Sequence, residues 1–253
     1  MADRIPSGRP SPASPPAAGG RSRVGPADLT SALYQTLSRR LVPLVPGALG
    51  RGPERDGQRR PLLYLTIDDG PDPESTPRWL DALAAWDARA VFFLTAARAE
   101  AHPALARRIA DAGHRVASHG YTHADPWSRR PADLTADVNR AQVALEAILG
   151  VPVRDVRPPY GRVTPTLLRW AEAGRRVVLW DVLPGDWLPA RSPRALADAV
   201  LRDARAGSVV VLHDGAPAPR AIAAAGLALP SLRAAGWRFP ALPAAPALSA
   251  LDR

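Results

Sequence analysis

Two adjacent carboxylates and a pair of histidines carry the most specific chemistry in this chain of 253 residues. Asp68 and Asp69 end one apolar segment, and His119 and His123 follow another with four-residue spacing. A hydrolytic metal ion such as zinc takes about three histidine or carboxylate ligands and leaves one position open for water. A second carboxylate can then accept the proton of the attacking water. These residues predict a metal-dependent hydrolytic site, although an Asp-Asp-Gly-Pro run alone is also compatible with a simple turn.

An arginine stands directly before two prolines in the middle of the chain. Arg157 precedes Pro158 and Pro159, and prolines restrict the backbone around them. A guanidinium fixed in this way offers planar donors to a carboxylate. We therefore expect Arg157 to hold the catalytic base charged and oriented, with an exposed arginine on a rigid loop as the simpler alternative.

A third histidine, His213, follows the apolar segment 208–212. A histidine that is not needed for a metal is suited to act as a general acid when a carboxylate orients it and raises its pKa. Three acidic residues are candidates for that role: Asp181, Asp186 and Asp214. Trp187 and Leu212 are expected to bind substrate by walling an apolar slot for a small methyl group. His102 and His114 have no such neighbours in the sequence.

Composition restricts the kinds of site that this chain can form. It contains no cysteine, which excludes a disulfide framework, a thiolate metal site and a cysteine nucleophile. All basic residues are arginine, and the net charge of +9 is spread along the chain without a basic stripe. We therefore expect no specific nucleic-acid partner. No stretch approaches the roughly 20 apolar residues that span a bilayer.

The chain divides into four parts by composition. Residues 1–27 are rich in Pro, Ser, Gly and Arg and are expected to form a disordered tail. Residues 28–60 are expected to form an N-terminal helix, with leucine at every fourth position, and a polar connector. A single catalytic domain over 61–242 and a C-terminal tail over 243–253 complete the organisation.

Short apolar runs alternate with helical patterns through the catalytic domain, which is typical of an α/β fold with a parallel sheet. The seven expected strands are 62–67, 90–94, 115–118, 153–157, 176–181, 208–212 and 237–242. The clearest helix runs over 131–149 before Gly150, with an apolar face formed by Leu134, Val138, Val143, Leu145 and Ile148. This pattern predicts a (β/α) barrel of about seven strands, with the polar segments at the C-terminal ends of the strands.

Five ordered motifs over about residues 62–242 resemble the polysaccharide deacetylase family, whose catalytic unit is the NodB homology domain of carbohydrate esterase family 4. The family patterns T-F-D-D-G, H-S/T-x-x-H, R-P-P-Y-G, D-x-x-D-W and L-H-D correspond here to 66–70, 119–123, 157–161, 183–187 and 212–214. Ile67, Gly120 and Leu183 depart from the patterns, but no ligand or catalytic group is lost. The resemblance implies a distorted, partly open (β/α)7-type barrel.

The resemblance also implies a role for each site residue. Asp68 would be the general base, and the metal ligands would be Asp69, His119 and His123. The remaining catalytic residues would be Arg157, which tethers the base, Tyr160, whose backbone N–H faces the oxyanion, and His213, the general acid oriented by Asp186. The implied cofactor is a divalent metal, zinc before cobalt or nickel, since sites of this kind accept several ions.

The resemblance implies hydrolysis of the acetamide on an N-acetylated sugar, with a glycan as the partner. The alternatives are the same metal chemistry on O-acetyl esters or on a non-sugar C–N bond, and a non-catalytic glycan-binding module. No clear signal peptide is recognised, which favours the cytoplasm, whereas the family resemblance is compatible with the cell envelope or secretion. Ser38-Arg39-Arg40 before the apolar run 41–49 only loosely resembles a twin-arginine export signal.

Overall fold

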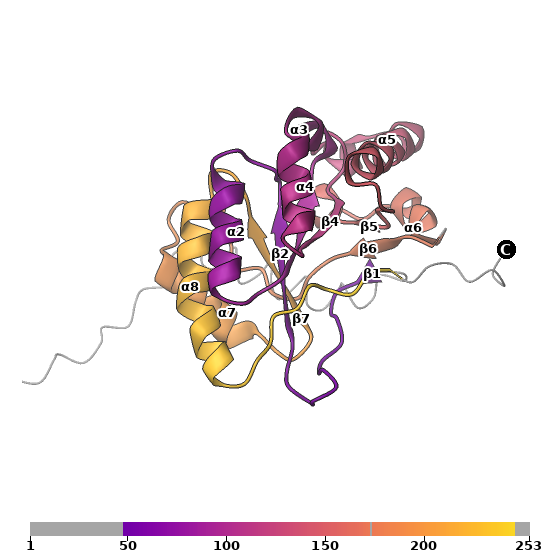
Figure 1. The fold of residues 1–253 in the computed structure, drawn as a ribbon. Helices are drawn as coiled ribbons and strands as arrows, with labels where there is room; N and C mark the ends of the chain where they lie inside the picture. The colour runs from indigo at the N-terminus through magenta and orange to yellow at the C-terminus, as the bar shows by residue number, and fades with distance from the viewer. Residues whose placement is uncertain (1–47, 173, 246–253) are drawn as a thin grey trace, which may run out of the picture.

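The computed structural model describes residues 48–172 and 174–245 and contains one curled sheet of seven parallel strands (Figure 1). The strands are β1 (Ala48–Leu49), β2 (Leu63–Asp68), β3 (Ala90–Leu94), β4 (Arg115–Ser118), β5 (Asp155–Val156), β6 (Arg176–Val178) and β7 (Ser208–His213). Their order across the sheet is β1-β6-β5-β4-β3-β2-β7. The fold is the distorted (β/α)7-type barrel that the sequence predicts.

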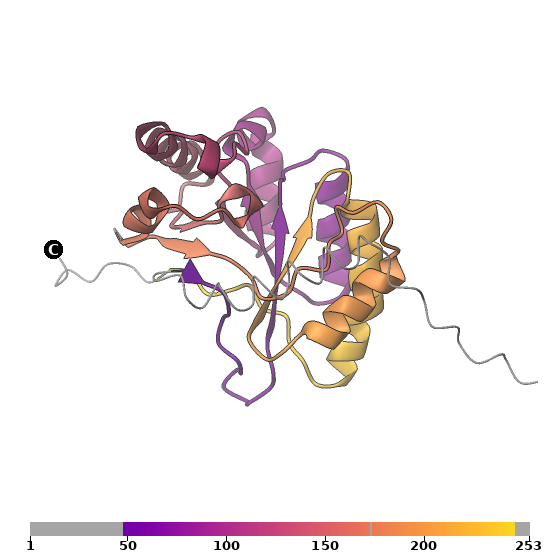
Figure 2. The same cartoon turned by 180° about the vertical axis from the view of Figure 1, so that it is seen from behind.

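Helices connect the strands and pack outside the sheet (Figure 2). They are α2 (Ser75–Ala85), α3 (Ala96–Ala101), α4 (Pro103–Asp111), α5 (Pro131–Leu149), α6 (Pro165–Glu172), α7 (Pro193–Asp203) and α8 (Ala218–Ala234), with two short 3-10 helices, η2 (Pro126–Ser128) and η3 (Pro159–Gly161). In both views α7 and α8 lie side by side near β7, while α5 and α6 lie at the opposite end of the sheet.

The core lies in two layers, one on each face of the sheet. Leu65 and Ile67 of β2 pack in the outer layer against the helices, whereas Tyr64 belongs to the inner layer. Because side chains alternate along a strand, Thr66 and Asp68 share the inner face with Tyr64. Burial on both faces explains why the strands read as nearly continuous apolar runs in the sequence. The same alternation brings polar groups to the mouth of the barrel.

Asp181 joins the two edges of the curled sheet. Its carboxylate accepts hydrogen bonds from the hydroxyl of Ser208 and the backbone N–H of Val209, each at 2.8 Å. Nε of Arg51 lies 3.4 Å from the same carboxylate, and Arg51 forms an antiparallel bridge with Ser208. Asp181 is therefore a structural residue of the barrel closure.

The predicted helix over 131–149 is confirmed by α5. Gly150 caps its end in the left-handed conformation, with φ at 69°. The buried side chains of α5 include Leu134, Val138 and Leu145. One assignment to the apolar face is wrong, because the side chain of Val143 is 67% exposed.

The predicted strand over 237–242 is also wrong. Arg238 forms one isolated parallel bridge with Leu62, and Pro240 cannot donate the backbone hydrogen bond that would extend the pairing. The seventh strand is β1, in a segment that the sequence analysis assigned to the N-terminal helix and connector. Strand β1 pairs with β6 in parallel register. The domain limits at 61 and 242 stay a prediction, although strand β1 lies before residue 61.

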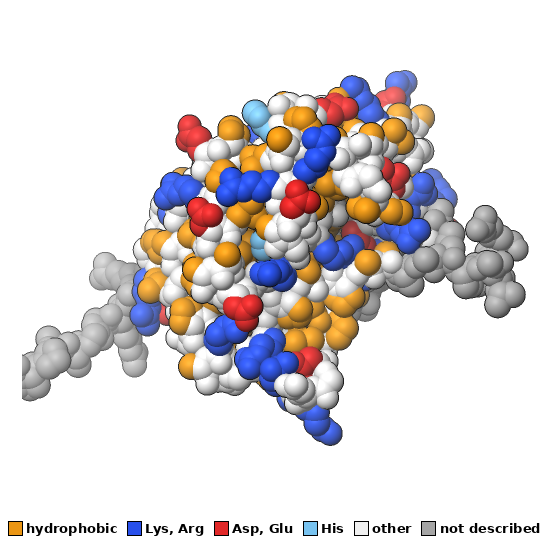
Figure 3. Space-filling view, in the orientation of Figure 1, with side chains coloured by type: hydrophobic (Ala, Val, Ile, Leu, Met, Phe, Trp, Pro, Cys, Tyr) orange, Lys and Arg blue, Asp and Glu red, His pale blue; other side chains and the backbone are white. Residues whose placement is uncertain are grey.

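The predicted N-terminal tail, the helix from Asp28 and the arginine pair at 39–40 lie outside the described residues. Within the described part of the chain, we find no helix with the length and apolar character needed to cross a membrane. Arginine and acidic side chains are interspersed on the face in Figure 3, without a continuous basic stripe. The expectation of no specific nucleic-acid partner stays a prediction.

Candidate metal centre and active site

Five segments that are distant in the sequence meet at one rim of the barrel. Asp68 ends β2 and His213 ends β7, and the two residues are register partners. His119 follows β4 directly, and Arg157 follows β5. Asp186 lies in the loop between β6 and α7. The polar residues thus gather at the C-terminal ends of the strands, as the barrel architecture predicts.

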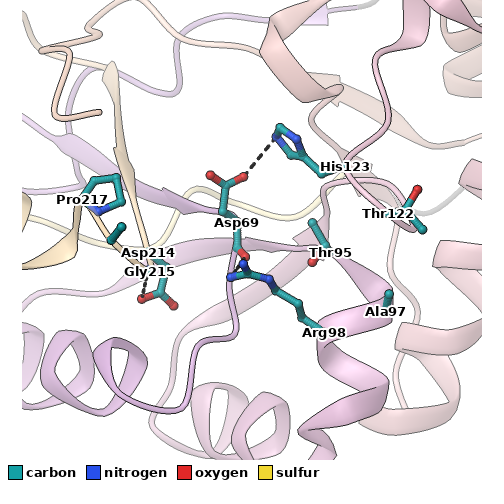
Figure 4. A pocket seen from close by; sticks show the side chains of 10 residues that line it. Asp69, Thr95, Ala97, Arg98, Thr122, His123, Asp214, Gly215 and Pro217 are labelled. Atoms are coloured by element: carbon teal, nitrogen blue, oxygen red, sulfur yellow. Dashed lines mark hydrogen bonds and ion pairs between the residues drawn. The ribbon is translucent and has the colours of Figure 1, made fainter. Parts of the chain in front are cut away.

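Asp69, His119 and His123 form a compact group whose ligand atoms all lie within 4.8 Å of one another. Oδ1 of Asp69 lies 3.4 Å from Nε2 of His119 and 3.2 Å from Nε2 of His123. The contact with His123 is marked in Figure 4. Among the described residues, this buried oxygen accepts no hydrogen bond. An unsatisfied carboxylate oxygen beside two imidazole nitrogens fits a divalent cation, so the residues present suit the predicted metal.

The backbone around this group adopts conformations that side chains other than glycine rarely use. The φ angles are 75° at Asp69, 59° at His123 and 58° at Tyr160. Such conformations cost on the order of 1–3 kcal/mol each and persist where the surrounding structure holds them, often at functional sites. All three residues lie on one rim, so the backbone there is held in costly conformations that fix the positions of these side chains.

The ring of His119 is oriented by the backbone of Arg157. Nδ1 of His119 lies 2.8 Å from the carbonyl oxygen of Arg157. A carbonyl can only accept, so Nδ1 carries the proton and Nε2 keeps its lone pair for a metal.

The loop between the two histidines is held by α5, because the N–H of Tyr121 donates to Oδ2 of Asp137 at 3.0 Å. Gly120 has φ at 80°, and an added Cβ would meet that same oxygen at 3.2 Å. This explains the glycine at a motif position where the family pattern has Ser or Thr.

The carboxyl group of Asp69 is held in its charged form. Burial raises its pKa, but the adjacent imidazoles of His119 and His123 outweigh burial, and the net result is a pKa far below the usual range. The carboxylate is therefore available as an anionic ligand at any physiological pH.

Arg157 is completely buried and contacts the first aspartate of the pair. Its Nη1 donates to Oδ1 of Asp68 at 2.6 Å and to the hydroxyl of Thr66 at 2.7 Å. Nε and Nη2 donate to the carbonyls of Val178 and Leu179. Burial lowers the pKa of Arg157, and the Asp68 carboxylate opposes that shift. Four hydrogen bonds fix the guanidinium, so Asp68 has a rigid cationic partner.

His213 pairs with Asp186. Nδ1 of His213 lies 2.8 Å from Oδ1 of Asp186, and the backbone N–H of His213 donates to Oδ2 at the same distance. Burial lowers the pKa of His213, but the charge and hydrogen bond of Asp186 outweigh it and raise the pKa to about 9. The imidazole is thus protonated near neutral pH.

The other two carboxylates that the sequence left open as partners of His213 have different roles. Asp181 closes the sheet, as described above. Asp214 accepts hydrogen bonds from the hydroxyls of Ser75 and Thr76 and from the N–H of Gly215, and burial raises its pKa. Asp214 therefore anchors α2 to the end of β7.

Of the two residues expected to bind substrate, one lies at the rim and the other does not. The ring of Trp187 contacts that of His213 edge to face, with centroids 5.3 Å apart. Leu212 is 2% exposed and packs in the outer core layer, on the opposite face of β7 from His213. The expectation that Leu212 walls a substrate slot is therefore corrected, because the alternation of the strand turns its side chain toward the helices.

A cavity of about 480 Å³ opens beside the group of three ligands (Figure 4). Asp69 and His123 form part of its wall, and Arg98 of α3, Thr95 and Gly215 are among the residues that line the rest. Nη1 of Arg98 donates to the backbone carbonyl of Asp69 at 3.1 Å. The candidate metal site is thus directly accessible to a molecule in this cavity.

Comparison with known proteins agrees with this geometry. The family model described as polysaccharide deacetylase matches residues 55–178. A chitooligosaccharide deacetylase of Sinorhizobium fredii is 41% identical over 165 residues, which are 64% of this chain and 76% of that protein. The chain belongs to the polysaccharide deacetylase family.

Other members of the polysaccharide deacetylase family show the same relationship. A peptidoglycan-N-acetylglucosamine deacetylase of Bacillus cereus is 33% identical over 184 residues, covering 72% of this chain and 66% of that protein. The crystal structure of a peptidoglycan N-acetylglucosamine deacetylase superposes with a TM-score of 0.73 at 30% identity, covering 78% of this chain and 91% of that one. The family resemblance and the barrel fold are therefore confirmed.

Sequence reasoning missed two residues of this polysaccharide deacetylase site. Thr66 was noted only as part of a motif, although its two-residue spacing from Asp68 on a strand places both on one face. Arg98 lies on α3, outside all five motifs, and nothing in its sequence neighbourhood connects it with Asp69. Its position depends entirely on how α3 packs beside the rim.

Proposed function

We propose that this protein removes N-linked acetyl groups from an N-acetylated sugar or polysaccharide, with release of acetate. The relatives named above support the substrate class, since they are chitooligosaccharide and peptidoglycan-N-acetylglucosamine deacetylases. The observation that carries the proposal is the buried Oδ1 of Asp69, without a hydrogen bond, between Nε2 of His119 and Nε2 of His123. A base and an acid candidate, Asp68 and His213, flank this point at register positions of adjacent strands.

Asp69, His119 and His123 would hold a divalent metal, and we propose zinc, with cobalt or nickel as substitutes. When bound, the ion supplies Lewis acidity toward the amide carbonyl and toward water. The ligand types support this choice, because two imidazoles and one carboxylate leave an open position on a tetrahedral ion.

Asp68 accepts the proton of the attacking water. Arg157 places a buried positive charge 2.6 Å from its Oδ1, which fixes the orientation of the carboxylate. The other oxygen, Oδ2, lies 3.9 Å from Nε2 of His119, so it faces the ligand group. One oxygen is thus tethered while the other is directed at the reaction centre, as a general base requires.

His213 donates a proton to the departing amine. Its pKa of about 9 keeps it protonated at neutral pH, and Asp186 orients the ring through Nδ1. This leaves Nε2 as the nitrogen that carries the proton to be transferred. Protonation is essential because an amine anion is a poor leaving group.

Tyr160 offers its backbone N–H to the oxygen of the tetrahedral intermediate. Its ring contacts that of His123 edge to face, with centroids 4.8 Å apart, which supports its place beside the ligands. Trp187, 39% exposed and against His213, borders the space for the acetyl methyl group.

Acetate release tests the function directly. Chelator-treated protein is incubated with N-acetylglucosamine oligomers and with peptidoglycan, with and without zinc, cobalt or nickel. We expect acetate only after metal is restored. If protein that has bound one equivalent of metal releases no acetate from these glycans but hydrolyses O-acetyl esters, the amide assignment is wrong and the ester alternative takes its place.

A further inference from the structure

Trp127 is the most exposed aromatic side chain in the described part of the chain, with 67% of its surface accessible. It lies on η2, and it belongs to neither layer of the core. A large aromatic ring outside the core contributes little hydrophobic stabilisation and leaves apolar surface in contact with water. Its exposure therefore needs an explanation other than folding.

The exposed ring is nevertheless held in place. Its Nε1 donates to the carbonyl of Val163 at 3.2 Å, and its backbone N–H donates to Oδ1 of Asp125 at 3.0 Å. The guanidinium of Arg162 lies over the ring, with Cζ 4.8 Å from the centroid, and also pairs with Asp125. One face of the indole is thus covered by a fixed cation. The two hydrogen bonds and the stacked guanidinium make this exposed ring a rigid apolar platform.

This platform is connected to the candidate metal centre by a row of contacts. Cζ of Arg162 also lies over the ring of Tyr160, 5.4 Å from its centroid. Tyr160 is itself 52% exposed and touches His123. Trp127, Arg162, Tyr160 and His123 therefore form one continuous row along the rim. Trp127 lies at the far end of that row, separated from the candidate ligand His123 by the side chains of Arg162 and Tyr160.

The chemistry of the row suits a sugar better than a protein partner. A pyranose ring has an apolar C–H face that packs on an indole and hydroxyl groups around its edge that need polar partners. Arg162 and Asp125 place a charged donor and a charged acceptor beside the indole. A protein interface would instead need a broader apolar patch around the aromatic anchor.

We propose that Trp127, stacked on Arg162, forms a separate glycan-binding subsite that packs on a sugar ring of the substrate chain away from the sugar whose acetyl group is removed. This inference rests on the proposed function and deepens it, because it makes the protein an enzyme that prefers longer oligomers. Binding at such a remote subsite contributes to substrate and transition-state binding alike, so it lowers KM with little effect on kcat.

The kinetic test compares the hexamer of N-acetylglucosamine with the dimer. In Trp127→Ala we expect KM for the hexamer to rise about tenfold, and the preference for hexamer over dimer to fall by the same factor. Trp127→Phe keeps a stacking ring but loses the bond to Val163, so it should recover most of that preference. Val143→Ala, an equally exposed side chain on α5, is the matched control and should keep the wild-type ratio. An unchanged ratio in Trp127→Ala would overturn the subsite.

A binding test separates this inference from the proposed function. Chelator-treated protein is titrated with the hexamer by calorimetry, where no acetate can be released. We expect the Kd of Trp127→Ala to be about tenfold weaker than that of the wild type, with an unchanged melting temperature. Equal Kd values, or no binding by the wild type, would overturn the subsite whatever the acetate assay shows. A wild type that binds through Trp127 but releases no acetate would overturn only the deacetylase assignment.

Discussion

The carbonyl oxygen of Arg157 lies 2.8 Å from Nδ1 of His119, and the guanidinium of the same arginine lies 2.6 Å from the carboxylate of Asp68. One residue thus orients a candidate metal ligand through its backbone and the candidate base through its side chain. Its backbone and side-chain contributions can be separated by mutation, because a substitution changes only the side chain.

Arg157→Lys should therefore spare the metal and impair the base. A lysine keeps the charge but cannot reproduce the four hydrogen bonds of the guanidinium. We expect kcat/KM to fall by about 100-fold while metal content stays at the wild-type level. Steady-state kinetics and elemental analysis on the same samples measure both. The control is Arg154→Lys, a partly exposed arginine directly before β5. Wild-type kinetics in Arg157→Lys would contradict the tethering role.

His119→Ala and His123→Ala should each lose metal and activity together. Each substitution removes one of three ligands, and two ligands hold a first-row ion far more weakly than three. His102→Ala provides the matched control, because His102 is an exposed residue between α3 and α4. Metal titration of the chelated proteins measures the affinity. An active His119→Ala protein with normal metal content would refute the ligand assignment.

Asp186→Asn should move the basic limb of the pH–rate profile to lower pH. Burial lowers the pKa of His213, and Asp186, together with the charges of Asp68 and Asp69, raises it from 6.5 to about 9, so loss of the Asp186 charge lowers the pKa. A general acid works only while protonated, so the rate then declines at lower pH than in the wild type. The pH dependence of kcat is the measurement, and a limb at the wild-type pH would show that another group is the acid.

The same pair should stabilise the fold in a defined pH range. The pKa of His213 is raised in the folded state, so its contribution is complete below pH 6.5 and is lost as pH rises through about 9. The difference in unfolding free energy between the wild type and Asp186→Asn should therefore shrink as the pH rises from 6.5 to about 9. Denaturant unfolding of the chelated proteins at several pH values measures it.

Asp181→Ala should destabilise the barrel without altering the chemistry. The substitution leaves the hydroxyl of Ser208 and the N–H of Val209 without their buried acceptor, which costs about 2–4 kcal/mol. Asp81→Ala, whose ion pair with Arg108 is exposed, should change stability by less than about 0.5 kcal/mol. A shifted pH–rate profile in Asp181→Ala would instead favour a role for Asp181 beside His213.

Much of the site follows from the sequence because its residues stand in short motifs at the ends of apolar runs. Donor chemistry predicts a metal site from His119, His123 and one of the two adjacent aspartates, and the family resemblance implies Asp69; the parallel arrangement of strands predicts that their loops share one rim. Helix α5 was equally predictable, since its periodicity extends over nineteen residues and ends at Gly150.

Tertiary structure alone decided the rest, because contacts between distant segments depend on strand order and loop path. Side-chain chemistry left Asp181, Asp186 and Asp214 open as partners of His213; the structure pairs Asp186 with His213, as the family resemblance implied, and uses Asp181 in the closure of the sheet. It placed β1 at the edge of the sheet, since a strand of two residues has too little periodicity to be recognised. It also brought Trp127 against Arg162, a pairing across thirty-five positions of sequence that no local pattern encodes.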